Sequence, residues 1–427
     1  MKFQFSLLAG AALVAGLAQG IASDWPQYQG PKANRTTDES IQTRWPDGGP
    51  RQLWKTPLKS GFSSFAVADG RAYTLVVREI QTVKSEMCIA LDAERGNELW
   101  AAKLGTAYYD GGGDSGAPGN DGGDGPRSTP AAESNRVYVV SAGLVLSCFN
   151  GQNGEVLWKK DLVREFGAKG ISWQNAASPL IDGNLLFVCG GGDGQALLCF
   201  HKVTGGLVWK GQNDRMTHST PVAATILGHR QIVFLTQSGL VSVVPGTGKV
   251  LWRYSFPYRT STAASPVVGG EIVFCSAGYG VGSAAVQISK DGEQFKATEL
   301  WRSKLMNHWS SSVYHDGHLY GLFGFKEWQQ VPLKCVELAT GQEKWSKSGF
   351  GQGGLVLAAS TLVVLAENGE LVAVNADAAN YSELARCKAV TGKCWNSPAL
   401  ANGRIFARST KEGVCLDVSK PVSGAAQ

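Results

Sequence analysis

The stretch that decides the fold is residues 129–161, TPAAESNRVYVVSAGLVLSCFNGQNGEVLWKKD. It contains four short apolar runs, at about 129–133, 136–142, 145–150 and 155–161, separated by turns rich in Asn and Gly. Runs of β-branched and aromatic residues bounded by such turns are typical of strands joined as hairpins. The stretch therefore predicts a unit of four short antiparallel strands.

One phrase of this unit, a glycine followed after three residues by tryptophan, recurs along the chain. It stands at Gly96–Trp100, Gly154–Trp158, Gly205–Trp209, Gly248–Trp252 and Gly341–Trp345. Trp54 and Trp301 keep the ending without the glycine, and Ala385 occupies the Trp position of an eighth copy. The average spacing of about 47 residues is the period of a propeller blade. A flat indole can cover the bare backbone of a glycine and join neighbouring blades. We therefore predict structural docking roles for Trp54, Trp100, Trp158, Trp209, Trp252, Trp301 and Trp345.

A second phrase, Ser/Thr-Pro before an apolar strand, gives the same count of eight. Clear copies start at Thr129, Ser178, Thr220, Ser265 and Ser397, and looser copies start near Ser64, Ser312 and Leu355. Turn pairs that supply positive φ follow several of them, namely Asp69-Gly70, Asp182-Gly183, Asp316-Gly317 and Asn402-Gly403. Each unit thus has a first hairpin of its own.

The two ends of the repeat region complement one another. Leu53–Pro57 supplies only the last strand of a unit, whereas about 397–401, 404–409 and 413–417 supply only the first three. Pairing these segments completes an eighth unit and removes the exposed edges of an open sheet. We predict an all-β fold: a single eight-bladed β-propeller of four-stranded antiparallel blades, closed by pairing of the N-terminal strand with three C-terminal strands. A β-sandwich array is the alternative.

Composition agrees with a turn-rich β protein and argues against several functions. Of 427 residues 54 are Gly and 13 are Trp, and only 18% are charged. The net charge of +5 is too small and too scattered to predict nucleic-acid binding. No later segment contains the run of about 18 apolar residues that a membrane span needs.

The N-terminal segment predicts export. Residues 1–23, MKFQFSLLAGAALVAGLAQGIAS, have a Lys, an apolar stretch and then small residues, as a secretory signal peptide does. Cleavage after Gly20 and cleavage near Ser23 both fit, and an uncleaved anchor is the alternative. We expect a periplasmic or secreted protein with an N-terminal extension at 24–49, the propeller at 50–420 and a tail at 421–427.

The nine cysteines do not predict a disulfide framework. Five of them occupy nearly the same position in successive repeats, too far apart to pair, and should be small buried residues: Cys88, Cys148, Cys199, Cys335 and Cys415. Cys387 and Cys394 form the best candidate pair, since a bond between them would close a short loop.

The longest interruption, residues 105–127, is a Gly/Asp-rich inserted loop. Its four acids are weak candidates for calcium ligands: Asp110, Asp114, Asp121 and Asp124. Their spacing matches no EF-hand. A polar insertion without a ligand and a contact with a partner are the alternatives.

Polar and aromatic residues precede the innermost strands, where the connections of a propeller meet around its central channel. The funnel or ligand candidates are Arg127, Trp173, Gln174, His218, Asn307, His308, Trp309, Gln352, Trp395 and Asn396. Stacking surfaces with convergent polar groups suit a planar polar ligand, and packing at the rim is the alternative. His218 and His308 have the right chemistry for a general base, but the sequence places no carboxylate to orient either. Catalytic residues are therefore unknown.

The repeats resemble those of the quinoprotein-like (PQQ-like) eight-bladed β-propellers. The tryptophan-docking motif of that family, Ala-x-Asp-x-x-Thr-Gly-x-x-x-Trp, has its closest copies at 90–100 and 337–345, ALDAERGNELW and ELATGQEKW. The opening at 24–31, DWPQYQGP, looks like the start of secreted bacterial members with a single propeller. The resemblance covers about 50–420 and implies the fold more than an activity.

Two branches of this family imply different functions. One contains dehydrogenases that hold pyrroloquinoline quinone and calcium in the funnel. The other contains the noncatalytic propeller lipoprotein of outer-membrane β-barrel assembly. The adjacent cysteines and haem motif common in the first branch are absent here, as is the lipid-anchor cysteine of the second.

Three functions follow as hypotheses. The first is a noncatalytic periplasmic binding or scaffold protein that recruits a protein partner in the cell envelope, in envelope protein assembly. The second is a dehydrogenase of alcohols or sugars that uses pyrroloquinoline quinone and calcium. The third is binding of a carbohydrate or another small molecule in the funnel. A funnel carboxylate beside Asn or Arg would favour the enzyme.

Overall fold

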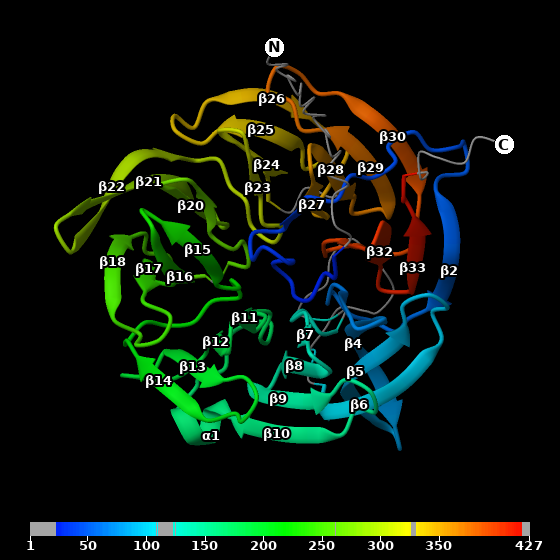
Figure 1. The fold of residues 1–427 in the computed structure, drawn as a ribbon, viewed down its shortest axis with the longest axis horizontal. Helices are drawn as coiled ribbons and strands as arrows, with labels where there is room; N and C mark the ends of the chain where they lie inside the picture. Colours follow the sequence, from blue (N-terminus) through cyan, green and yellow to red (C-terminus); the bar gives the residue numbers. More distant parts are fainter. Residues whose placement is uncertain are drawn as a thin grey trace, which may run out of the picture.

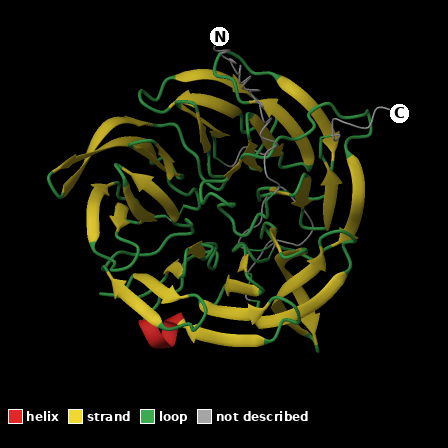
Figure 2. Ribbon diagram, in the orientation of Figure 1, coloured by secondary structure: helices red, strands yellow, loops and turns green. Residues whose placement is uncertain are grey.

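In a computed structural model the repeats form a closed ring of eight blades around a central axis (Figures 1 and 2). The structure describes residues 23–107, 109, 123, 125–260, 262–325 and 330–420. The predicted fold class is confirmed: each blade is a four-stranded antiparallel sheet, and the described part contains only one short helix, α1 (Leu162–Phe166). No helix of the described residues is long and apolar enough to cross a bilayer.

The blades follow one another in chain order. Blade 1 contains β3 (Ala66–Ala68), β4 (Arg71–Ile80), β5 (Val83–Asp92) and β6 (Glu98–Thr106). Blade 2 contains β7 (Ala131–Glu133), β8 (Arg136–Val140), β9 (Val145–Asn150) and β10 (Val156–Asp161). Blade 3 contains β11 (Leu180–Asp182), β12 (Leu185–Cys189), β13 (Leu197–His201) and β14 (Leu207–Gly211). Blade 4 contains β15 (Val222–Ile226), β16 (His229–Thr236), β17 (Gly239–Val243) and β18 (Val250–Ser255).

The second half of the ring repeats this order. Blade 5 contains β19 (Val267–Gly269), β20 (Ile272–Ala277), β21 (Gly282–Asp291) and β22 (Gln294–Ser303). Blade 6 contains β23 (Val313–His315), β24 (His318–Leu322), β25 (Leu333–Glu337) and β26 (Glu343–Lys347). Blade 7 contains β27 (Gly354–Ala358), β28 (Thr361–Leu365), β29 (Glu370–Asn375) and β30 (Glu383–Lys388). Blade 8 contains β31 (Ala399–Ala401), β32 (Arg404–Arg408), β33 (Glu412–Asp417) and β2 (Arg51–Pro57).

The predicted closure is present in blade 8. Its outermost strand, β2, comes from the N-terminal side of the chain and pairs antiparallel with β33, Trp54 facing Cys415. The last residues of the ring are thereby tied to its first. Since every strand of this blade then has its partner, the ring has no open end.

Glycine and tryptophan join the blades in the order that the repeat implies. A Cβ on Gly96, Gly154, Gly205, Gly248 or Gly341 would lie within 2.7 Å of the indole of the preceding blade. That indole also donates a hydrogen bond to the neighbouring blade, as Trp100 Nε1 does to the Gly151 carbonyl at 2.9 Å. Trp252 differs, because its Nε1 donates to Gln231 Oε1 within its own blade.

The Ser/Thr residues of the second phrase form a buried belt around the channel. At several positions the amide of one belt residue donates to the hydroxyl of the next: Ser64 to Thr129 at 3.0 Å, Thr129 to Ser178 at 2.9 Å, and Ser178 to Thr220 at 2.9 Å. Ser265 donates to Ser311, and Ser397 donates back to Ser64. The repeat thus fixes blade spacing from the inside as the tryptophans do from the outside.

Two details of the prediction need correction. Cys387 and Cys394 are free thiols. Cys387 lies on β30, the outer strand of blade 7, and its side chain lies against Gly49. Cys394 is fully buried on the connection that carries the chain inward, where its amide donates to the Glu367 carbonyl at 3.0 Å. The short loop between the two thiols therefore runs from the outer strand toward the channel.

The second detail is a turn. Gly183 and Asn184, not Asp182 and Gly183, are its central residues, because Asp182 pairs with Leu185. Only Gly183 has positive φ there, at 59°. Asn402 and Gly403 both have positive φ, at 54° and 69°, as expected for this pair.

Residues 23–41, here called the plug, enter the channel from one face (dark blue in Figure 1). Trp25 pairs with Val67 on β3, Pro26 accepts from the Ala132 amide on β7, and the side chain of Gln27 bonds Ile181 on β11. Farther along, β1 (Thr36–Thr37) adds a parallel strand to β27. The plug thus runs along the inner wall past most of the blades.

Candidate functional site

Strand direction divides the connections of the propeller between two faces. Because strands alternate in direction, the turns after the first and third strands of each blade lie at one face. The turns after the second strand and the connections between blades lie at the other, which we call the mouth. The plug lies at the first face: Asp24 accepts from the Asp69 amide at the β3–β4 turn, and Glu39 accepts from Gly403 at the β31–β32 turn.

In blades 6 and 7 the belt positions are Ser311 and Gly354, one residue before the phrase copies at Ser312 and Leu355, because Ser311 accepts from the Ser265 amide and Gly354 lies against Ser397. At the mouth, the residue two positions before each belt position forms what we call the inner ring. In chain order the ring is Phe62, Arg127, Ala176, His218, Ala263, Trp309, Gln352 and Trp395. Five of the ten funnel candidates belong to it. The two alanines, in blades 3 and 5, are small, so the large side chains come from the remaining blades.

Three rings from blades 6, 8 and 1 form a stacked column. The Trp309 and Trp395 centroids are 4.4 Å apart at an interplanar angle of 24°. Phe62 stacks with Trp395 at 5.2 Å and 26°. Trp395 Nε1 also donates to Glu367 Oε1 at 2.5 Å, which fixes the middle ring from the β28–β29 turn. The sequence missed Phe62 because blade 1 has Ser64-Phe65 in place of Ser-Pro.

Two cations lie against the faces of this column. Lys393 Nζ lies 4.4 Å from the centroid of Trp395 and 5.5 Å from that of Phe62, and its side chain is buried. The guanidinium of Arg127 lies 5.9 Å from Phe62 and donates to the Gly123 and Gly125 carbonyls. Cation–π contacts of this kind gain strength when water is excluded. Lys393 was missed, although its place two residues before Trp395 was visible.

A buried carboxylate lies next to this cationic region. Glu86, at the mouth end of β5, is 2% exposed, and its Oε2 accepts from the Ala142 amide of blade 2 at 2.9 Å. Burial raises the pKa of Glu86 to about 7, although the Ala142 amide, Arg127 and Tyr109 act to lower it. The sequence missed this residue because it stands inside a strand, and only folding brings it near Arg127.

The two histidines do not share one environment. Burial, and then Arg127, lower the pKa of His218 to about 3, so this imidazole is neutral and a weak base at neutral pH. His308 lies among aromatic rings, with Tyr279, Trp309 and Phe325 at centroid distances of 5.0 to 5.2 Å.

The other candidates fall into two groups. Trp173 is 38% exposed and stacks on Tyr279 at 6.1 Å, and both Trp173 and Gln174 have left-handed backbone, with φ of 65° and 63°. Asn307 is a buried cross-link, because its Nδ2 donates to the Leu322 carbonyl at 2.7 Å and its Oδ1 accepts from Ser312. Asn307 therefore holds the connection between blades 5 and 6 in place.

Gln352 and Asn396 are buried with amide atoms that have no partner among the described residues. Ser128, Ser219 and Ser310 each directly follow the inner-ring residue of their blade. The hydroxyls of these serines are also buried and have no partner among the described residues. Buried polar atoms of this kind are usually satisfied by ordered water. The channel between the column and the plug is therefore polar.

The calcium candidates Asp110, Asp114, Asp121 and Asp124 lie outside the described residues. Among the described residues, no group of three or more His, Cys, Asp or Glu could hold a metal ion.

The fold and the site define a class of protein: an eight-bladed propeller whose channel is plugged at one face and covered by stacked aromatic side chains at the other. The sequence profile of the family described as outer membrane protein assembly factor BamB matches residues 84–322. The chain belongs to this family of PQQ-like propellers.

Solved structures share the fold at low identity. BamB from Moraxella catarrhalis is 13% identical, with a TM-score of 0.59 over 88% of this chain and 99% of that one. The quinohemoprotein alcohol dehydrogenase from Comamonas testosteroni is 14% identical, with a TM-score of 0.63 over 95% of this chain and 82% of that one. No curated protein matches the sequence. At such identities the likeness concerns the fold alone.

Proposed function

We propose that the protein is a noncatalytic binding or scaffold protein of the cell envelope, which acts in outer-membrane or envelope protein assembly through its mouth. The observation that carries this proposal is the stacked column of Phe62, Trp395 and Trp309. The rings of the column stack face to face on one another. The centre of the mouth therefore presents an aromatic surface rather than an open slot between rings. Export by the N-terminal signal peptide would place this surface in the periplasm.

The chemistry of the mouth suits a protein partner. Trp and Arg dominate the energetics of protein interfaces, especially where they stand on a rigid, well-packed base. Here Arg127 and Lys393 lie against the column, and Trp173, with 38% of its surface exposed, stacks on Tyr279. The membership in a family of outer-membrane assembly factors supports a partner from that process.

The experiment is complementation of cells from which the encoding gene is deleted. We expect Trp173→Ala to fold normally and to leave outer-membrane β-barrel proteins at the reduced level of the deletion, because an exposed anchor is lost. Leu157→Ala, a 43% exposed residue on the outer strand β10, is the matched control and should restore the wild-type level. Full restoration by Trp173→Ala, or no defect in the deletion, would contradict the proposal.

A quinone-dependent dehydrogenase is the second candidate, and one observation favours it. Glu86 lies next to Arg127, and a carboxyl with a pKa of about 7 suits a general base. The column does not fit the cofactor, however, because a planar quinone would have to separate rings whose centroids are 4.4 to 5.2 Å apart. The column therefore supports no reaction step through the quinone.

Calorimetric titration with pyrroloquinoline quinone, with and without calcium, separates the two candidates. The scaffold predicts no binding in either condition. Calcium-dependent binding at micromolar concentration or below would make the dehydrogenase the leading function, and a dye-linked assay over alcohols and sugars would follow.

A further inference from the structure

The plug contains a buried carboxylate for which the described residues supply no cation. Glu39 is 3% exposed and takes part in none of the ion pairs of the described residues. Its oxygens accept from neutral groups: Ser23 N at 3.1 Å, Ser23 Oγ at 3.3 Å, and the amides of Asn402 and Gly403 at 3.2 and 2.7 Å. Buried charges in proteins are normally paired with an opposite charge. A cation at this position would pair with the Glu39 carboxylate.

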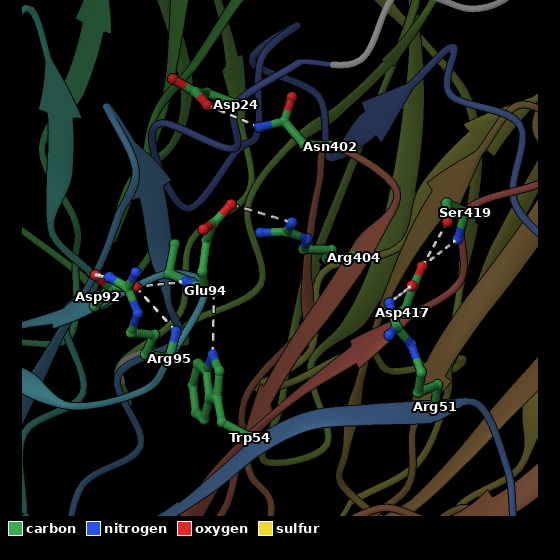
Figure 3. A network of polar contacts seen from close by, with 11 residues as sticks. Asp24, Arg51, Trp54, Asp92, Glu94, Arg95, Asn402, Arg404, Asp417 and Ser419 are labelled. Atoms are coloured by element: carbon green, nitrogen blue, oxygen red, sulfur yellow. Dashed lines mark hydrogen bonds and ion pairs between the residues drawn. The ribbon is translucent and has the colours of Figure 1, made fainter.

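Ser23 is placed to supply that cation. Its backbone nitrogen donates to Glu39 Oε1 at 3.1 Å. Its carbonyl accepts from the Asn402 amide at 3.1 Å. Asp24 accepts from Asn402 Nδ2 (Figure 3), and it also accepts from the Asp69 amide. The backbone is thus fixed from Ser23 onward. An α-ammonium at this nitrogen would carry a positive charge and three donors where the peptide amide has one.

The residues before Ser23 fit a processing site. Gly20 and Ala22 are small residues at the third and first positions before the Ala22–Ser23 bond, as signal peptidases require. The rival bond, Gly20–Ile21, also follows small residues but would leave its new ammonium two residues away from Glu39. Only cleavage before Ser23 puts the charge on the nitrogen that contacts the carboxylate.

We propose that the mature protein begins at Ser23 and that its new α-ammonium pairs with Glu39 inside the closed face. A signal peptidase would hydrolyse the Ala22–Ser23 bond with one water, which leaves a carboxylate on Ala22 and an ammonium on Ser23. The ion pair then ties the N-terminus to the β31–β32 turn of blade 8.

The first test is the N-terminus of the protein that a host exports from the full-length chain. Mass spectrometry of the purified exported protein should give a chain that starts at Ser23. A start at Ile21 or at Asp24, or an uncleaved chain, would overturn the proposal.

The second test measures the ion pair. A full-length variant with one glycine inserted between Ala22 and Ser23 is exported, and its start at that glycine is checked by mass. Its ammonium is displaced by one residue, so we expect its Tm to fall by about 3 °C or more. In the Glu39→Gln background the insertion should cost nothing, because no charge is left to lose. An equal loss in both backgrounds, or no loss in either, would overturn the proposal.

Glu94→Gln is the matched control. Glu94 is an exposed carboxylate on the same face, 3.4 Å from Arg404 (Figure 3), and among the described residues it forms no hydrogen bond or ion pair with the plug. The effect of the insertion should be unchanged in this background. If Glu39→Gln does not fold, the insertion in the wild-type and Glu94→Gln backgrounds still decides whether the position of the ammonium matters.

Discussion

The two faces of the propeller are closed by different means. At the plug, backbone pairing joins the chain to the blades, since Trp25 pairs with Val67 and β1 pairs with β27, and buried side chains such as Arg35 add hydrogen bonds. At the mouth, closure depends on the side chains of the inner ring, which differ from blade to blade. A change that disrupts backbone pairing disrupts the fold. Side chains on the connections can instead be replaced while the strands stay paired. The plug therefore serves the architecture, and the mouth is where a function can be specified.

The largest expected effect breaks the plug. Arg35 is 1% exposed; it donates to Tyr28 Oη and Ser397 Oγ, both at 2.8 Å, and to the Leu355 carbonyl. Arg35→Ala would leave these buried acceptors without their charged donor, at a cost of about 4 kcal/mol in the free energy of unfolding. Equilibrium urea unfolding measures it. Arg95→Ala, with a side chain 76% exposed, should change this energy by less than about 0.5 kcal/mol. Equal effects of the two variants would refute the structural role of the plug.

The second effect tests whether the mouth responds to pH. The pKa of Glu86 is about 7 in the folded protein and near the ordinary 4.5 in the unfolded chain. The folded state therefore holds a proton that the unfolded state releases, and stability falls as pH rises from 4.5 through 7. Over this range the wild type should lose on the order of 2 kcal/mol relative to Glu86→Gln.

Unfolding free energies at several pH values measure this loss, and Glu155→Gln, an exposed residue, is the control. A constant difference between wild type and Glu86→Gln would show that the carboxyl does not titrate in this window.

The third effect removes the centre of the column. Trp395→Ala deletes both stacking contacts and exposes Lys393, so we expect a loss of about 2 kcal/mol. Trp395→Phe keeps a flat ring and should recover more than half of this loss. If Trp395→Ala costs as much as Arg35→Ala in the same urea titration, the mouth is as structural as the plug.

The smallest effect concerns the belt that lies between the faces. Thr129→Val keeps the shape of the side chain but removes the acceptor of the Ser64 amide, at a cost of about 1 kcal/mol. Hydrogen exchange should show faster exchange of the Ser64 amide alone. Unchanged protection of that amide would mean that another acceptor replaces the hydroxyl.

Sequence reasoning found the mouth only where the repeat pointed to it. Arg127, Trp309 and Trp395 were found because each stands just before a recognisable first strand. Sequence reasoning missed three residues of the mouth. Phe62 precedes an atypical strand, Lys393 is a lysine, which sequence patterns place at the surface, and Glu86 lies within a strand. The predicted disulfide between Cys387 and Cys394 was wrong. A short separation along the chain did not reveal that Cys387 lies on the outer strand of blade 7 and Cys394 on the connection toward the channel.

The sequence by itself determined the eight blades and their closure. Strand alternation, turn pairs and the Gly–Trp spacing act between near neighbours and recur along the chain, so local chemistry is enough to define the blades. Only the tertiary structure decided that Glu39 meets Ser23 under the β31–β32 turn, that three rings stack over the channel, and that Glu86 has a pKa of about 7. These properties depend on burial and on contacts between residues distant in the chain, and ring closure alone brings those residues together.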